Sequence, residues 1–166
     1  AYDSSVTPSW FGLVQGAALK VLSVFRAPGG YGTWRVARAP ASPYHPDPSR
    51  PWRRGAPEGL LEIPAGTSPR WRIPYCATVQ FAFGHRRLLR GTHALGDEPL
   101  VYVVHALDFV DSSEVDGTTG RHPTLRLSLD ERLLRLREIL GSVAQGRRAS
   151  TLLQYATDRA SRELVG

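Results

Sequence analysis

The sequence contains no methionine, one cysteine and one lysine among its 166 residues. The lone Cys76 excludes a disulfide within the chain and any metal site built on a Cys-x-x-Cys pair. No apolar run reaches the roughly 18 residues that a membrane span requires, so we expect no helix across a bilayer. Because the chain begins AYDSSVTPSW, within what reads as a motif, we interpret it as a fragment or processed chain whose upstream part is missing.

Positive charge is carried almost wholly by arginine, because only Lys20 among the 21 basic residues is lysine, and the formal net charge is +6. Nucleic-acid-binding proteins gather their basic residues on one surface and intersperse aromatic ones. Here the arginines are spread along the chain, in pairs at 53 and 54, 86 and 87, 132 and 135, and 147 and 148. We therefore favour the composition of a GC-rich genome as their origin and expect no nucleic-acid partner, the segment RWR at 70–72 being the best local candidate for one.

Strand-like and helix-like segments alternate along the chain, whose length suits about one domain. Strands are expected at 60–63 and 100–105, with a short one at 148–151, and helices at 11–25, 74–89, 128–140 and 152–164. Ser128 with Glu131, and Thr151 with Gln154, match the capping-box pattern that begins a helix. Such alternation predicts an α/β fold with parallel strands.

A Pro-rich segment at residues 27–59 interrupts this order and holds many of the 13 prolines. Proline removes a backbone donor and forbids long helices and central strands. We expect a long surface excursion, with short edge strands around residues 33–38. A loop of this length in a compact domain is usually functional or disordered.

The most hydrophobic strand, expected at Leu100–Val104, ends on His105, and two acids, Asp108 and Asp111, follow. In parallel α/β folds, functional side chains gather at the C-terminal ends of strands. Histidine exchanges a proton near neutral pH, so His105 is a candidate general acid or base. The alternative is a histidine that only caps the sheet and bonds a carbonyl group.

Five sequence segments, taken in their order along the chain, carry a resemblance to a known family: YDSSVTPSW, LLEIPAGTSP, LVYVVHALDFVD, HPTLRLSLDERLLRLREIL and STLLQYA. Together they resemble the C-terminal half of the polysaccharide deacetylase family, also called carbohydrate esterase family four. The likeness covers most of residues 1–166, apart from the insert at 27–59. It implies a distorted (β/α) barrel with about seven strands, of which this chain would be the C-terminal part.

The resemblance also implies an activity, the hydrolytic deacylation of an amino sugar in a glycan, glycolipid or lipid-linked sugar, with a divalent metal such as zinc. The family's early Thr-Phe-Asp-Asp and His-x-x-x-His motifs, which supply the base and metal ligands, do not occur here. No metal ligand is therefore expected in this chain. The family's late Leu-x-His motif matches Val103-Val104-His105, which would make His105 the general acid. Asp108 and Asp111 would orient the ring or bind substrate at the barrel mouth.

Other interpretations stay open at this stage. The chain could be a catalytically inactive, barrel-derived sugar-binding domain, or an Arg-rich binder of nucleic acid or an anionic surface. Aromatic residues of the insert could stack on sugar rings or pin the insert to the core. The acidic loop around Asp111 could meet an amine product or be merely solvated, and His45, His85 and His122 are expected at the surface. We expect a bacterial protein, of the cytoplasm or cell envelope, that pairs with the missing N-terminal half of the same domain.

Overall fold

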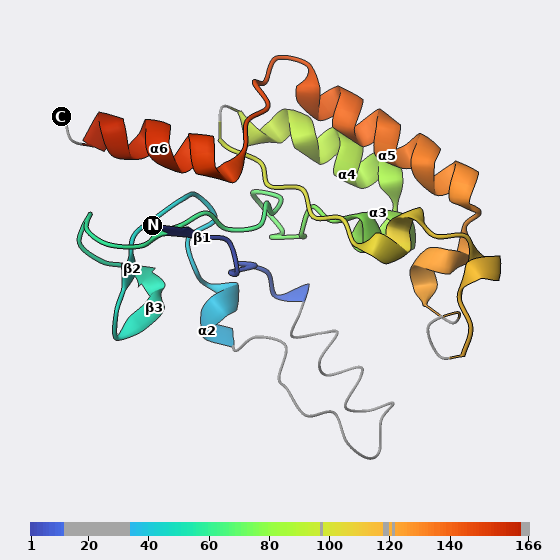
Figure 1. The fold of residues 1–166 in the computed structure, drawn as a ribbon, viewed down its shortest axis with the longest axis horizontal. Coiled ribbons are helices and arrows are strands. Elements are labelled where there is room, and N and C mark those ends of the chain that lie inside the picture. Colours follow the sequence, from blue (N-terminus) through green and yellow to red (C-terminus); the bar gives the residue numbers. More distant parts are fainter. Residues whose placement is uncertain (12–33, 97, 118–119, 121, 164–166) are drawn as a thin grey trace. The chain divides into compact units, whose positions relative to one another are not determined.

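The computed structural model describes residues 1–11, 34–96, 98–117, 120 and 122–163 (Figure 1). The chain combines helices and strands, as expected for the α/β class. Its internal contacts divide it into two compact units. Unit 1 comprises residues 1–67, 71–74 and 149–166, and unit 2 comprises residues 68–70 and 75–148. Nearly all of the helix expected at 11–25 lies outside the described residues.

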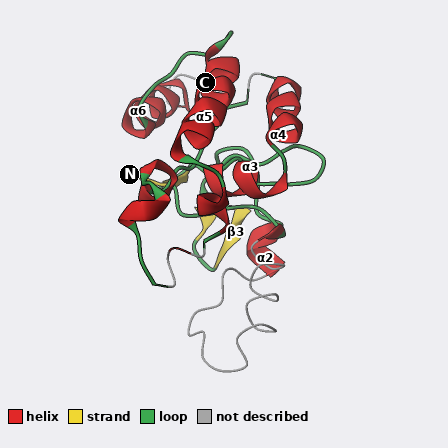
Figure 2. Ribbon diagram, turned by 90° about the vertical axis from the view of Figure 1, so that its right-hand side faces the viewer, coloured by secondary structure: helices red, strands yellow, loops and turns green. Residues whose placement is uncertain are grey.

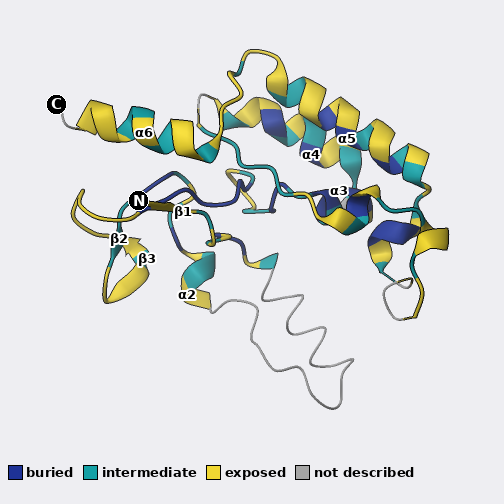
Figure 3. Ribbon diagram, viewed as in Figure 1, coloured by how far each residue is buried: buried dark blue, intermediate teal, exposed yellow. Residues whose placement is uncertain are grey.

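A short parallel pair of strands lies at the centre of unit 1. β1 (Tyr2–Asp3) pairs with β4 (Leu61–Glu62), with Tyr2 opposite Leu61. The backbone N–H of Ile63 then donates to the carbonyl oxygen of Asp3 at 2.8 Å. The segment from 61 to 67 is buried throughout, and buried residues are coloured dark blue in Figure 3. The strand expected at 60–63 is confirmed as this buried β4.

In its described part, residues 34–59, the Pro-rich segment contains a hairpin and a short helix. β2 (Pro46–Asp47) and β3 (Arg50–Arg54) pair antiparallel, and the Asp47 carboxylate accepts the backbone N–H groups of Ser49 and Arg50 in the turn between them. The prediction of edge strands around residues 33–38 is wrong, because Trp34–Ala37 forms the helix α2. The guanidinium group of Arg72 donates to the carbonyl oxygens of Ala37 and Ala39, which satisfies acceptors at the end of this turn.

The helix α6 (Leu152–Glu163) completes unit 1. Thr151 Oγ1 accepts the N–H of Gln154 at 3.1 Å, so the expected start of this helix is confirmed. At its other end Glu163 contacts His45 Nε2 at 3.1 Å. The side chain of His45 is only 13% exposed, which differs from the solvent-exposed histidine expected there. The strand expected at 148–151 does not form within the described residues.

Unit 2 contains the helices α3 (Ala77–Phe83) and α4 (His85–Thr92) where one helix over 74–89 was expected. The break falls at Gly84, whose φ is +121°. Residues with a side chain rarely adopt this φ, so the glycine separates the two helices. α4 lies beside α5 (Leu129–Ala144) in both views of the ribbon (Figures 1 and 2).

The helix α5 begins where expected, because Ser128 Oγ accepts the N–H of Glu131. Leu129, Leu133, Leu136 and Leu140 recur at helical spacing along α5, but they do not make up its buried face. Arg132, Leu136 and Ile139 are buried, whereas Leu133 and Leu140 are 37% and 47% exposed. Leu136 packs against Ala77 and Phe81 of α3 in the core of unit 2, with Tyr102 and Leu127 at its edge.

The third strand expected, at 100–105, is reduced to one parallel bridge between Cys76 and Val103. A parallel strand is hydrogen-bonded to a neighbouring strand along its length. Among the described residues of this segment, only Val103 pairs with a neighbouring chain segment. Among the described residues the strands form two-stranded sheets and do not close into a barrel. None of the described helices is both long and apolar enough to cross a membrane.

Candidate functional site

His105 follows directly from an extended segment at the edge of the core of unit 2, in which residues 100–103 are partly buried and Val104 is exposed. The N–H of Val103 donates to the carbonyl oxygen of Tyr75, and the N–H of Ala77 donates to that of Val103, each at 3.0 Å. His105 then stands at the N-cap of a short 3-10 helix, η2 (Ala106–Phe109). The apolar segment is therefore held by backbone hydrogen bonds, and the histidine emerges where this support ends.

Asp108 lies underneath His105. Its Oδ2 atom accepts the backbone N–H of His105 at 2.7 Å and lies 3.7 Å from the ring atom Nδ1. The His105 side chain is 59% exposed, whereas that of Asp108 is 1% exposed. A buried carboxylate thus faces one edge of an accessible imidazole ring. The opposite edge, with Nε2, is the edge that a substrate can approach.

The second carboxylate oxygen of Asp108, Oδ1, is buried and has no hydrogen-bond partner among the described residues. Nearly all buried polar atoms in native proteins are paired, so this oxygen atom is an exception. Its burial gives Asp108 a different position from the one expected of a substrate-binding residue. The geometry favours the other role considered for it, that of orienting the ring of His105.

Arg132 holds the loop that carries both residues. Its guanidinium group donates to the carbonyl oxygens of Leu107 at 2.9 Å and Val110 at 2.7 Å, and its Nε donates to that of Leu127 at 3.2 Å. The side chain is fully buried within unit 2. One arginine of α5 therefore joins the start of that helix to the turn that presents His105.

The surroundings of Asp108 raise the proton affinity of two neighbouring acids. Burial raises the pKa of the Cys76 thiol, and the charge of Asp108 raises it further. Burial also raises the pKa of Tyr102, with contributions from Cys76 and Asp108. Both groups are therefore neutral near pH 7, and Cys76 is not a reactive thiolate there.

Asp111 caps the next turn. Its Oδ1 accepts the N–H and the hydroxyl of Ser113, and its own N–H donates to Glu114 at the end of η3 (Ser112–Glu114). These hydrogen bonds from Ser113 lower the pKa of Asp111. The residue is thus an anionic group on the loop that follows η2, and a role in binding an amine or a sugar hydroxyl remains a prediction.

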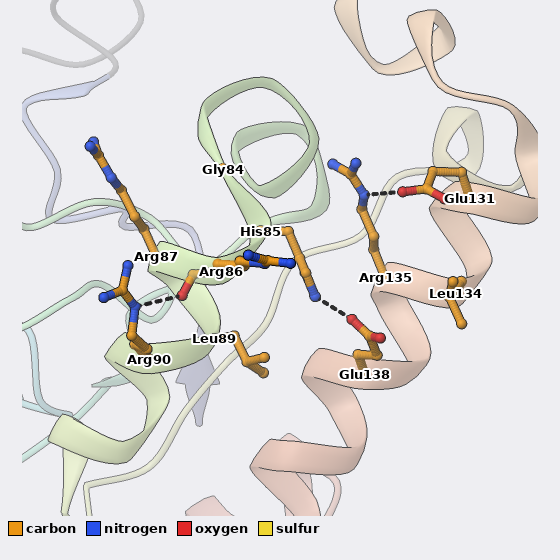
Figure 4. A pocket seen from close by; sticks show the side chains of 10 residues that line it. All are labelled: Gly84, His85, Arg86, Arg87, Leu89, Arg90, Glu131, Leu134, Arg135 and Glu138. Atoms are coloured by element: carbon orange, nitrogen blue, oxygen red, sulfur yellow. Dashed lines mark hydrogen bonds and ion pairs between the residues drawn. The ribbon is translucent and has the colours of Figure 1, made fainter.

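A second polar cluster in unit 2 runs from the core to the space between α4 and α5. Tyr102 donates to the side-chain oxygen of Gln80, whose Nε2 contacts His85 Nδ1 at 2.7 Å and the carbonyl oxygen of Arg135 at 2.8 Å. His85 Nε2 in turn contacts Glu138 at 2.5 Å (Figure 4). Since the Gln80 amide donates both N–H groups, His85 Nδ1 accepts, and the ring proton lies on Nε2. His85 is therefore a linking residue rather than the surface residue expected.

The groove between α4 and α5, called the α4–α5 groove below, has a volume of about 770 Å³. Basic, acidic and apolar side chains line it together (Figure 4). Arg135 contacts Glu131, and Glu138 contacts His85, so both acids of the groove already have partners. Its lining is formed by Gly84, His85, Arg86, Arg87, Leu89, Arg90, Glu131, Leu134, Arg135 and Glu138.

A metal ion finds no ready site in the part of the chain that the structure describes. No three His, Cys, Asp or Glu side chains converge there in a way that could hold one. A catalytic zinc needs about three protein ligands. His105 and Asp108 do not fit this need alone, so no chemical step is assigned below to a metal held by these residues.

Sequence reasoning missed Arg132 and Gln80, the two buried polar side chains that organise unit 2. Arg132 carries a readable signal, since it shares one face of α5 with Leu136 and Ile139 at helical spacing. Gln80 sits in the apolar run ATVQFAF of α3, where a polar side chain needs a buried partner. In both cases a polar residue on an apolar helix face indicates an internal hydrogen-bond network.

Comparisons with protein-family models, with curated proteins and with solved structures each find no match to this chain. The geometry of the site and the motifs of the sequence therefore carry the functional argument.

Proposed function

We propose that this chain forms the C-terminal part of a hydrolase that removes an acyl group from an amino sugar, and that His105 is its general acid. The observation that carries the proposal is the buried Asp108 carboxylate, 3.7 Å from Nδ1 of the exposed His105 ring. A carboxylate beside one ring nitrogen leaves the other nitrogen to exchange a proton with substrate. The resemblance of Val103-Val104-His105 to the late motif of polysaccharide deacetylases supports the same role.

His105 acts when the amide bond breaks. As water adds to the acyl carbon and the C–N bond cleaves, the leaving nitrogen takes a proton from Nε2 of protonated His105. The products are a free amine on the sugar and the carboxylic acid. Proton transfer by a positioned side chain contributes typically 10²–10⁴-fold to a rate.

The remaining parts of the machinery lie outside the described residues in this proposal. A divalent metal such as zinc would activate the water by lowering its pKa, with ligands and base supplied from elsewhere in the full protein. The rest of the barrel of about seven strands would also be supplied from elsewhere in the full protein. From this chain, β1, β4 and the segment around Val103 would contribute to it. Asp111 would bind the substrate's amine or hydroxyl groups at the mouth.

The test is product analysis with the complete protein that carries this chain. N-acetylated amino-sugar oligosaccharides are incubated with it in the presence of zinc, and acetate and primary amine are both quantified. The proposal predicts equal molar release of the two. Binding of the oligosaccharide without release would contradict catalysis and would favour the inactive sugar-binding domain.

A further inference from the structure

Two arginines and two tryptophans of unit 1 form a continuous stack, called the Arg–Trp ladder below: Arg38, Trp34, Arg35 and Trp52. The Arg38 guanidinium carbon lies 4.9 Å from the Trp34 ring centre. That of Arg35 lies 5.9 Å from Trp34 and 5.0 Å from Trp52. These are cation–π distances. The ladder joins α2 to β3, two elements of the Pro-rich segment.

The ladder belongs to a strongly basic surface. Between residues 34 and 54 the chain has five arginines and one acid, Asp47, which gives a net charge of +4. Within the described residues these arginines make no ion pair with a carboxylate. Arg54 is held by Pro43 and Ser42, which leaves the others to face solvent. The positions concerned are Arg35, Arg38, Arg50 and Arg53.

Stacking leaves the hydrogen-bonding edge of a guanidinium group free. The guanidinium groups of Arg35 and Arg38 lie over indole rings, and a guanidinium group can form two parallel bonds to a carboxylate or phosphate. The stack also limits the conformations of the arginine side chains, which lowers the entropy lost on binding. A row of such groups fits a ligand with repeated negative charges rather than a single ion.

The tryptophans are less suited to nucleic acid. Proteins that bind single strands offer open aromatic faces on which bases stack. Here Arg35 and Arg38 both contact the Trp34 ring, and Arg35 also contacts Trp52. The surface therefore offers exposed guanidinium groups and the exposed part of Trp34, which is 56% exposed.

We infer that the Arg–Trp ladder is a docking surface for an anionic glycan chain that bears carboxylate groups. The choice of a glycan among polyanions rests on the deacylation proposed above, whereas the requirement for negative charge rests on the exposed arginines of this surface. In a glycan, a carboxylate group supplies that charge in a form that a guanidinium group can bind through two parallel bonds. In this arrangement the ladder holds a charged polysaccharide, and its role is binding, separate from the proton transfer assigned to His105.

The experiment measures binding of the full chain to polygalacturonate, with neutral dextran and a single-stranded oligothymidylate as comparisons. The test variant is Arg35→Gln with Arg38→Gln. The control is Arg126→Gln with Arg137→Gln, two exposed positions of unit 2 that remove the same charge. Each lost charge-assisted contact corresponds to roughly a tenfold loss. We expect the ladder variant to bind polygalacturonate at least about tenfold more weakly, while the control stays within about twofold.

Three results would overturn the inference: no preference for polygalacturonate over dextran, equal weakening by ladder and control variants, or tighter binding of the oligothymidylate than of the uronate polymer. The last would assign the surface to nucleic acid. Failure of the deacylase proposal is separable, because His105→Ala should leave polygalacturonate binding unchanged. If no acetate is released but binding still depends on the ladder, the deacylase proposal is wrong and the docking surface stands.

Discussion

Asp108 touches His105 twice, through a 2.7 Å hydrogen bond to the backbone N–H and through a carboxylate oxygen 3.7 Å from the ring atom Nδ1. The hydrogen bond to the backbone fixes the turn that leads into η2, and the carboxylate oxygen faces the imidazole ring. Because the aspartate is buried and the histidine exposed, only one of the two residues can meet a substrate directly. In the proposed mechanism the aspartate is therefore a positioning residue.

Replacing Asp108 by Asn separates these roles. The amide keeps the size of the side chain but removes the negative charge beside Nδ1. If that contact is worth about 1–1.5 kcal/mol, turnover of the complete enzyme should fall about tenfold, with KM little changed. A loss as large as that of His105→Ala would show that Asp108 acts in the reaction itself.

Replacing Arg132 by Met should unfold unit 2 more easily. The change leaves three partly buried carbonyl oxygens, those of Leu107, Val110 and Leu127, without their charged donor. We expect the free energy of unfolding to fall by roughly 2–4 kcal/mol, measured by urea denaturation. Arg137→Met, at an exposed position of the same helix, should change it by less than about 0.5 kcal/mol. Similar effects of both variants would contradict the role of Arg132.

Glu62 should make the stability of unit 1 depend on pH. Burial raises the pKa of this carboxyl above its ordinary value of 4.5. A group with a raised folded-state pKa stabilises the fold fully below its unfolded pKa, and this contribution is lost as the pH rises through the folded value. The free energy of unfolding should therefore decline above about pH 4.5.

The variant Glu62→Gln should remove this decline, because the amide does not titrate, while its oxygen can still accept the N–H of Val6. Urea denaturation at several pH values between about 4 and 7 measures the effect. Glu58→Gln, at an exposed position, serves as the control and should keep the dependence of the unchanged protein. An unaltered pH profile in Glu62→Gln would refute the assignment.

The rate at which the Cys76 thiol is alkylated should depend on the charge of Asp108. Because burial and Asp108 both raise its pKa, iodoacetamide should alkylate it more slowly at pH 8 than it alkylates free cysteine. Asp108→Asn should move the pH dependence of alkylation toward lower pH. Mass spectrometry of timed samples gives the rates. Equal rates for the folded chain and free cysteine would contradict the burial of this site.

Local signals predicted the parts of the fold that depend on local chemistry. Ser128 and Thr151 begin α5 and α6 because their hydroxyl groups accept N–H groups three residues on. The strand around Leu61 is confirmed because its buried apolar residues require a partner. The segment at Trp34–Ala37 was misjudged, because a distant side chain, that of Arg72, satisfies the carbonyl oxygens at its end.

The proximity of His105 and Asp108 was predictable from the sequence, whereas the contacts that support these residues were not. His105 and Asp108 stand close in sequence, so their proximity follows from a turn of three residues. The buried Arg132 and the chain from Tyr102 through Gln80 to His85 join residues far apart in sequence. Such contacts depend on how α3 and α5 pack, which hydrophobic periodicity alone does not specify.

The most direct test of the central claim is the turnover of His105→Ala in the complete protein, measured as acetate released from an N-acetylated oligosaccharide. Its melting temperature is measured beside it, and His93→Ala, at another exposed histidine of unit 2, is the control. We predict a fall of roughly 10²–10⁴-fold, or about 3–5 kcal/mol of transition-state stabilisation, with an unchanged melting temperature and a normal control. Near-normal turnover of His105→Ala would contradict the account.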